Sequence, residues 1–154
     1  LESYSKYLEY EEVQEYLKHH IAENWLSNVL LARDILQRGR EVAEQINILG
    51  DDGVPIDYHE KFWKAEVVDF IILQQDAFDK IDQSTPLPRQ EYMLNKVLEV
   101  YHTRFQFESF EEVGAFFKRI INQFKQMNYS EFQSEQFKEY EEELHAIINE
   151  RKIA

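Results

Sequence analysis

The chain has 154 residues, of which 44% are apolar and 14% aromatic, so it is long enough for one domain and too apolar for a disordered chain. It carries 17 basic and 30 acidic side chains, and the net charge of −13 disfavours a nucleic-acid partner and favours a basic or neutral protein surface. The absence of cysteine excludes disulfides and cysteine-ligated metals, and no apolar run is long enough to span a membrane.

The first third of the chain has the apolar spacing of long helices. An acidic, tyrosine-rich segment over 1–20 precedes one long helix predicted over 21–49. Within it, Gly39 costs about 1 kcal/mol relative to alanine and is a candidate kink position. The run Gly50–Pro55 then ends the helical pattern. No signal peptide is expected, and the first residue, Leu1, fits either processing or a fragment of a longer protein.

A second helix is predicted from about Tyr58 to about Gln75. Asp57 followed by Glu60 resembles a capping arrangement, with both carboxylates near the positive end of that helix. The segment 76–87 combines charges with Ser, Thr and Pro, which favours an irregular loop.

Three more helices are predicted in the second half. Pro88 is suited to open a helix that carries apolar residues as far as Phe105. Ser109 and Glu112 have the spacing of a capping box, and a last helix begins at about Ser134. Four glycines, three prolines and no period-two run leave little support for strands. We therefore expect an all-α fold, a bundle of five or six helices forming a single domain over residues 1–154.

The glycine pair Gly50 and Gly53 does not have the chemistry of a phosphate-binding loop. That loop needs a lysine, and here two aspartates, Asp51 and Asp52, separate the glycines. Their carboxylates would repel phosphate, so the segment is interpreted as a structural turn or a protein contact. The chain by itself is not expected to hydrolyse ATP.

Two Glu-x-x-His pairs, Glu99 with His102 and Glu142 with His145, match the spacing used in di-iron bundles. In a chain this rich in glutamate, two such pairs are close to chance. Both glutamates also lie far from the apolar stripes of their predicted helices, whereas bundle ligands point inward. His19 and His20 fit a solvated helix end better than a metal site. No metal site and no catalytic residue are predicted.

The segment 71–78 ends a buried helix in two amides, a carboxylate and Phe78. A phenylalanine just past a helix end can pack on the core, or it can present a flat face to a planar ligand. Composition alone favours the core and leaves the second interpretation open.

Four segments together resemble the catalytic A subunit of V/A-type rotary ATPases, and especially its bacterial form. They are Ser3–Tyr7, Ala43–Gly50, Leu73–Phe78 and Arg89–Leu94. The resemblance extends over essentially the whole chain but only about the C-terminal quarter of such a subunit. It implies a C-terminal helical bundle separated from a β-barrel domain and a P-loop nucleotide-binding domain.

The resemblance implies that the full subunit hydrolyses or makes ATP with Mg²⁺ and couples this reaction to rotation of a central stalk. Rotation drives H⁺ or Na⁺ across a membrane. The implied partners are regulatory B subunits in a hetero-hexameric head and the central stalk, at a cytoplasmic location peripheral to the membrane and without membrane insertion. The catalytic groups lie upstream, so no cofactor is expected for this chain alone.

Two roles carry over to positions of this sequence. Ala77 and Phe78 match residues that line the adenine pocket, with Phe78 packing on the base. The turn between 49 and 60 matches the tip that faces the central stalk, although it is richer in glycine than usual. The implied stalk contacts are Asp51, Asp52, Gly53, Val54 and Asp57. The alternative hypothesis is a free-standing acidic helical adaptor that binds a basic protein.

Overall fold

The computed structural model describes residues 2–75 and 87–153. This part contains five α-helices and one short 3-10 helix, in the order α1 (Glu2–Leu49), η1 (Asp51–Gly53), α2 (Ile56–Gln75), α3 (Pro88–His102), α4 (Phe110–Tyr129) and α5 (Glu135–Arg151). Its only β-type pairing is an isolated antiparallel bridge between Phe105 and Lys152. The predicted all-α fold is therefore confirmed.

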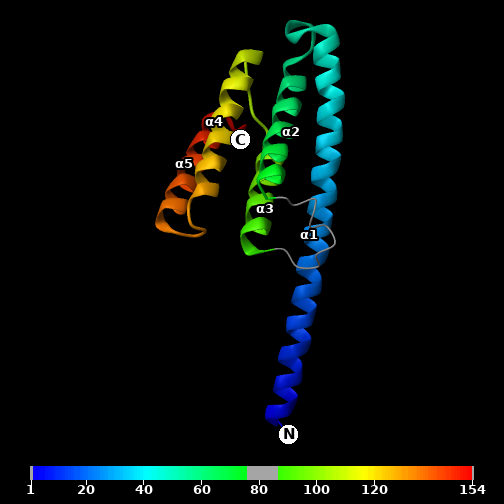
Figure 1. Cartoon of the computed structure of the whole chain (residues 1–154), viewed down its shortest axis with the longest axis vertical. Coiled ribbons are helices and arrows are strands. Elements are labelled where there is room, and N and C mark those ends of the chain that lie inside the picture. Colours follow the sequence, from blue (N-terminus) through cyan, green and yellow to red (C-terminus); the bar gives the residue numbers. More distant parts are fainter. Residues whose placement is uncertain (1, 76–86, 154) are drawn as a thin grey trace.

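The helix α2 occupies the centre of the bundle and packs against α1, α3 and α4. Figure 1 shows α1 and α2 as an antiparallel hairpin, with α4 and α5 forming a second hairpin on the far side of α2. The N-terminal part of α1 extends well beyond the other helices. The turn between α1 and α2 lies at the opposite end of the molecule, which we call the tip (residues 50–57).

The core is formed by the apolar faces of all five α-helices. In α4, Phe117, Ile120 and Phe124 are completely buried, as their spacing of three and four residues predicts for one helix face. Phe105, Phe107, Phe116 and Phe117 form an aromatic cluster with ring centroids 5.0–6.3 Å apart. Three of these phenylalanines are buried in the core, and Phe107 is partly buried against it.

A close helix–helix contact accounts for Gly39. The helix α1 is a single element of 48 residues that continues through this position. A Cβ atom added to Gly39 would lie 2.3 Å from the Cβ atom of Ala65 in α2, which is far inside van der Waals contact. The absence of a side chain at residue 39 therefore lets α1 and α2 approach each other.

The start of α2 differs from the prediction. The helix begins at Ile56, so Asp57 lies within its first turn and does not cap it. The reason is local, because the carbonyl of Pro55 accepts the N–H of Tyr58 at 3.1 Å and already closes the first turn. Asp57 instead pairs with Lys61, at 3.6 Å.

The start of α3 at Pro88 is confirmed, but its end falls earlier than predicted. Thr103 is the C-cap, and its extended backbone (φ −76°, ψ 137°) ends the helix, while its hydroxyl and its N–H both donate to the carbonyl of Glu99, at 2.7 Å and 3.0 Å. Phe105 is therefore in the connection to α4 and not in α3. It remains buried because it packs into the aromatic cluster.

The last two helices begin as the sequence predicts. The Ser109 hydroxyl accepts from the N–H of Glu112 at 3.3 Å, and the Ser134 hydroxyl accepts from that of Phe137 at 3.2 Å. The capping box at α4 is only half formed, since the Glu112 carboxylate accepts from the N–H of Glu108, at 2.9 Å, and not from Ser109.

Candidate functional site

The tip leaves α1 through a glycine in the left-handed region. Gly50 has a φ of 83°, a conformation that favours glycine, and its N–H donates to the carbonyl of Ile46 at 2.8 Å. The carbonyl of Gly50 accepts the N–H of Gly53 at 3.1 Å, which closes η1. The glycines of this segment therefore form a tight structural turn.

The residues predicted to contact a stalk lie together in this turn but differ in exposure. Asp51, Asp52, Gly53 and Asp57 are exposed, whereas Val54 is 8% exposed. The aspartates place negative charge on the outer surface of the tip. The side chain of Val54 is instead buried and is not available at the surface.

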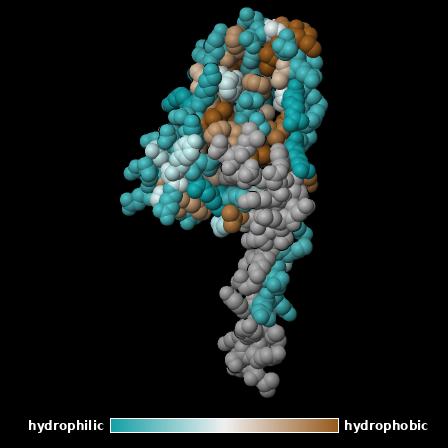
Figure 2. Space-filling view, in the orientation of Figure 1, coloured by the Kyte–Doolittle hydropathy of each residue, from teal (hydrophilic) through white to brown (hydrophobic). Residues whose placement is uncertain are grey.

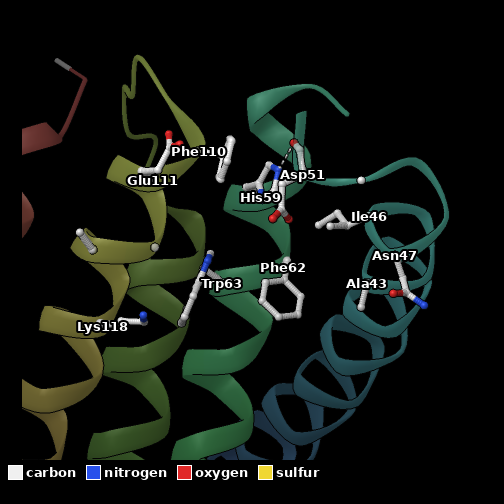
Figure 3. A pocket seen from close by; sticks show the side chains of 13 residues that line it. Ala43, Ile46, Asn47, Asp51, His59, Phe62, Trp63, Phe110, Glu111 and Lys118 are labelled. Carbon is white, nitrogen blue, oxygen red and sulfur yellow. Dashed lines mark hydrogen bonds between the residues drawn. The ribbon is translucent and has the colours of Figure 1, made fainter. Parts of the chain in front are cut away.

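His59 connects the turn to the rest of the molecule. It is buried in the first turns of α2, and its Nε2 donates to the backbone carbonyl of Asp51 at 2.8 Å (Figure 3). Its ring stacks on Phe110, at the start of α4, with centroids 5.1 Å apart. Neither residue was among the predicted site residues. A histidine preceding Phe62 and Trp63 by three and four positions, on one helix face, was the available signal.

A groove of about 870 Å³ opens between the α1–α2 hairpin and α4 beside the tip (Figure 3). We call it the tip groove. Its aromatic and apolar walls come from three helices, with Phe62 and Trp63 on α2, Ile46 on α1 and Phe110 on α4. The complete lining is Ala43, Ile46, Asn47, Gly50, Asp51, His59, Phe62, Trp63, Phe110, Glu111, Gly114, Ala115 and Lys118.

The two ends of the tip groove carry opposite charge. Near the turn it is lined by Asp51 and Glu111, and an adjoining hollow of about 280 Å³ adds Asp52 and Glu108. Away from the turn, the Lys118 ammonium lies 5.7 Å from the centre of the Trp63 ring. The end nearest the tip is therefore an acidic surface beside an aromatic wall, which suits a cationic, partly apolar partner.

Apolar side chains are also exposed at the end of α1. Ile48 and Leu49 are 75% and 55% exposed, directly before the turn. In Figure 2, hydrophobic surface gathers at the tip end and in the hollow below it, among mostly hydrophilic surroundings. Large apolar groups on a highly charged surface are typical of a contact with another molecule.

The remaining predicted positions that the structure describes do not line this groove. Ala77 and Phe78 lie outside the described residues. Glu99 and Glu142 are exposed, as predicted, and Glu99 pairs with Lys96 at 3.3 Å. Within the described ranges, no three histidine or carboxylate side chains are grouped closely enough to hold a metal ion. His19 pairs with Glu23, at 3.0 Å.

The fold and the tip together define an all-α bundle with an acidic, apolar-walled contact surface. The chain is 33% identical over 149 residues to the V-type ATP synthase alpha chain of Protochlamydia amoebophila, an alignment that covers 97% of this chain. It is also similar to the proteins of that name from Treponema denticola, 29% identical over 126 residues, and Chlamydia abortus, 32% identical over 126 residues. Each of these two alignments covers 82% of this chain.

The chain is thus a homologue of part of the V-type ATP synthase alpha chain, as its resemblance predicted. It spans about a quarter of the length of the curated relatives it matches, with 25% of the Protochlamydia protein and 21% of the other two covered. This proportion fits the C-terminal helical region of such a subunit. No protein-family model and no solved structure matched the chain.

Proposed function

We propose that residues 1–154 form the C-terminal helical domain of a V-type ATP synthase catalytic subunit. In this proposal the domain couples ATP hydrolysis or synthesis, performed by the rest of the subunit, to rotation of a central stalk and transport of H⁺ or Na⁺. The observation that carries the proposal is the 33% identity to a V-type ATP synthase alpha chain over 97% of this chain.

The architecture supports a role as a stiff lever. α2 is packed on three sides by other helices, and its inward residues Val67, Val68 and Ile71 are fully or almost fully buried. A core packed this closely deforms little, so a displacement applied to one part of the bundle moves the tip with it. The acidic tip would contact basic residues of the stalk, where charge sets approach and register without a tight bond.

The wider assembly follows from the same proposal. The full subunit would pair with regulatory B subunits in a hetero-hexameric head at the cytoplasmic face of a membrane. None of the helices in the described ranges is long and apolar enough to cross a membrane. Ion translocation would therefore be assigned to other subunits.

Nucleotide chemistry is assigned to other parts of the subunit. The full subunit would bind ATP with Mg²⁺, and the resemblance gives Ala77 and Phe78 a place in its adenine pocket. The described residues do not fit a phosphate site, since the exposed carboxylates of Asp51 and Asp52 flank the glycine turn. No catalytic role is proposed for this chain alone.

The free-standing acidic adaptor is not favoured. The relatives carry this segment as 21–25% of a longer chain named as an ATP synthase subunit, which is not the organisation of an independent adaptor. Both the adaptor hypothesis and the ATP synthase hypothesis use the acidic surface for binding, and they differ only in the partner.

Deleting Asp52 and Gly53 in the full-length subunit should impair coupling more than nucleotide binding. The deletion shortens the tip and removes the hydrogen bond between Gly53 and Gly50, while the buried residues of the core are unchanged. We expect ion transport per ATP hydrolysed to fall several-fold while the Kd for ATP stays within about twofold. Transport and hydrolysis are measured together in vesicles that contain the assembled enzyme, with circular dichroism as the folding control. Equal losses of coupling and binding would indicate misfolding and contradict the proposed role.

Replacing Phe78 by alanine in the full-length subunit should weaken ATP binding by roughly 1–3 kcal/mol, through lost stacking and packing on the base. Nucleotide titration of the assembled enzyme measures the change. Phe78→Tyr is the control, because it keeps the aromatic face and should bind nearly as well as the unchanged subunit. An unaltered affinity in Phe78→Ala would remove this residue from the pocket.

A further inference from the structure

The tip groove is hollow because the residues along its walls are small where the helices diverge. Ala43 on α1 and Gly114 and Ala115 on α4 face it. A Cβ atom added to Gly114 would lie 3.5 Å from the Trp63 ring, an ordinary contact distance, so the position does not need glycine for packing. The bundle therefore leaves about 870 Å³ beside aromatic side chains that its own chain does not fill.

The shape and the walls of the groove match the apolar face of a helix. Ile46, Phe62 and Trp63 line the side formed by α1 and α2, and Phe110 on α4 lines the other, all on helical segments that run away from the tip (Figure 3). A helix inserted into such a groove presents apolar side chains at i, i+3, i+4 and i+7 and buries them against both walls. An isolated small apolar ligand would leave the charged mouth unused.

The charge at the mouth selects a basic partner. Asp51, Asp52, Glu108 and Glu111 surround the end of the groove nearest the tip, on a chain whose net charge is −13. A second copy of this chain would bring the same carboxylates to the contact and be repelled, and a phosphate-bearing ligand would be repelled likewise. A helix with lysine or arginine next to an apolar stripe complements both the apolar walls of the groove and its acidic end.

We propose that the tip groove binds a basic amphipathic helix of a partner protein. Its apolar face packs against Ile46, Phe62 and Trp63, and its cations pair with Asp51 and Glu111. This inference deepens the proposed function. The identification of the partner as the central stalk rests on the proposed function, whereas the assignment of the groove does not. It extends the contact from the outer surface of the turn to a pocket formed by three helices.

The test uses the 154-residue chain and a synthetic leucine–lysine peptide of about 20 residues, roughly 30 Å long when helical. Trp63 is one of two tryptophans. In a Trp25→Phe variant, Trp63 is the remaining tryptophan, so the fluorescence emission reports on the groove. Calorimetry on the unaltered chain gives an independent affinity for the peptide. We expect the peptide to bind and shift the Trp63 emission, and a leucine–glutamate peptide of the same pattern to fail to bind.

Two double variants separate the groove from general charge attraction. Asp51→Asn with Glu111→Gln should weaken peptide binding about tenfold. Glu131→Gln with Glu139→Gln removes the same charge from exposed positions at the opposite end of the α4–α5 hairpin and should change the affinity by less than about twofold. In addition, Gly114→Leu should block the part of the groove beside Trp63 and abolish the Trp63 response.

Several outcomes would overturn the inference. Equal weakening in both double variants would show non-specific attraction to an acidic protein, and unchanged binding in Gly114→Leu would place the peptide elsewhere. If the chain self-associates and Gly114→Leu abolishes this self-association, the occupant of the groove would be a second copy of the chain. Because the peptide assay contains no rotary enzyme, normal peptide binding combined with intact coupling in the shortened-tip enzyme would refute the proposed function and leave the groove assignment standing.

Discussion

Replacing Gly39 by leucine is expected to destabilise the bundle by about 3 kcal/mol, at the upper end of the usual cost of overpacking. Even the first added carbon would lie 2.3 Å from the Cβ atom of Ala65, and a leucine adds three more carbons at the same point. Neither helix can move away freely, because α2 is also held by α3 and α4. The clash must therefore separate α1 from α2 or distort a side-chain rotamer.

Chemical denaturation followed by circular dichroism measures this loss. The stability of Gly39→Ala should fall between that of the unaltered chain and that of Gly39→Leu. Alanine gains about 1 kcal/mol in helix propensity over glycine, and this gain opposes the cost of the same clash. Combining Gly39→Ala with Ala65→Gly moves the methyl group to the partner helix and should restore most of the stability. Ala146→Leu, at an exposed position of α5, is the matched control and should have little effect. No recovery in the double variant would contradict the proposed contact.

Replacing Phe117 by alanine should cost about 3–5 kcal/mol, the usual range for removing a buried phenylalanine ring. Phe117 is 0% exposed. Its ring lies 5.2 Å from that of Phe116, 5.7 Å from that of Phe105 and 6.0 Å from that of Phe107. Its loss would leave a cavity among side chains that hold the α3–α4 connection against α4.

The same denaturation experiment tests this prediction, and Phe107→Ala provides the comparison. Phe107 belongs to the same aromatic cluster but is only partly buried, so its removal should cost clearly less. The denaturant dependence of the unfolding free energy should stay unchanged if the native fold is retained. Similar losses in the two variants would mean that the cluster acts through surface contacts and not through burial at Phe117.

Features that depend on local sequence were predictable. Pro88 opens α3, and Ser109 and Ser134 accept from the backbone where their spacing predicts, because helix caps involve residues only three positions apart. The buried residues of α4, such as Phe117 and Phe124, likewise follow the helical period that is visible in the sequence.

Features that depend on contacts between distant segments were not predictable from one sequence. Gly39 was interpreted from its helix propensity alone, because nothing near it indicates that Ala65 lies opposite. His59 carries no local sign that its ring will reach both the Asp51 carbonyl and Phe110. The tip groove exists only once α1, α2 and α4 are placed together, so the sequence identified the acidic turn but not the hollow beside it.

The unbroken length of α1 has a geometric consequence. Its 48 residues correspond to a rod of about 70 Å at the usual helical rise. A tilt of only about 5° around the N-terminal end would sweep Leu49 through roughly 6 Å, close to one helical pitch. Since the Gly39–Ala65 contact locks α2 to this rod, both would swing together. Angular changes too small to disturb a packed core thus become strokes as large as one full turn of a neighbouring helix.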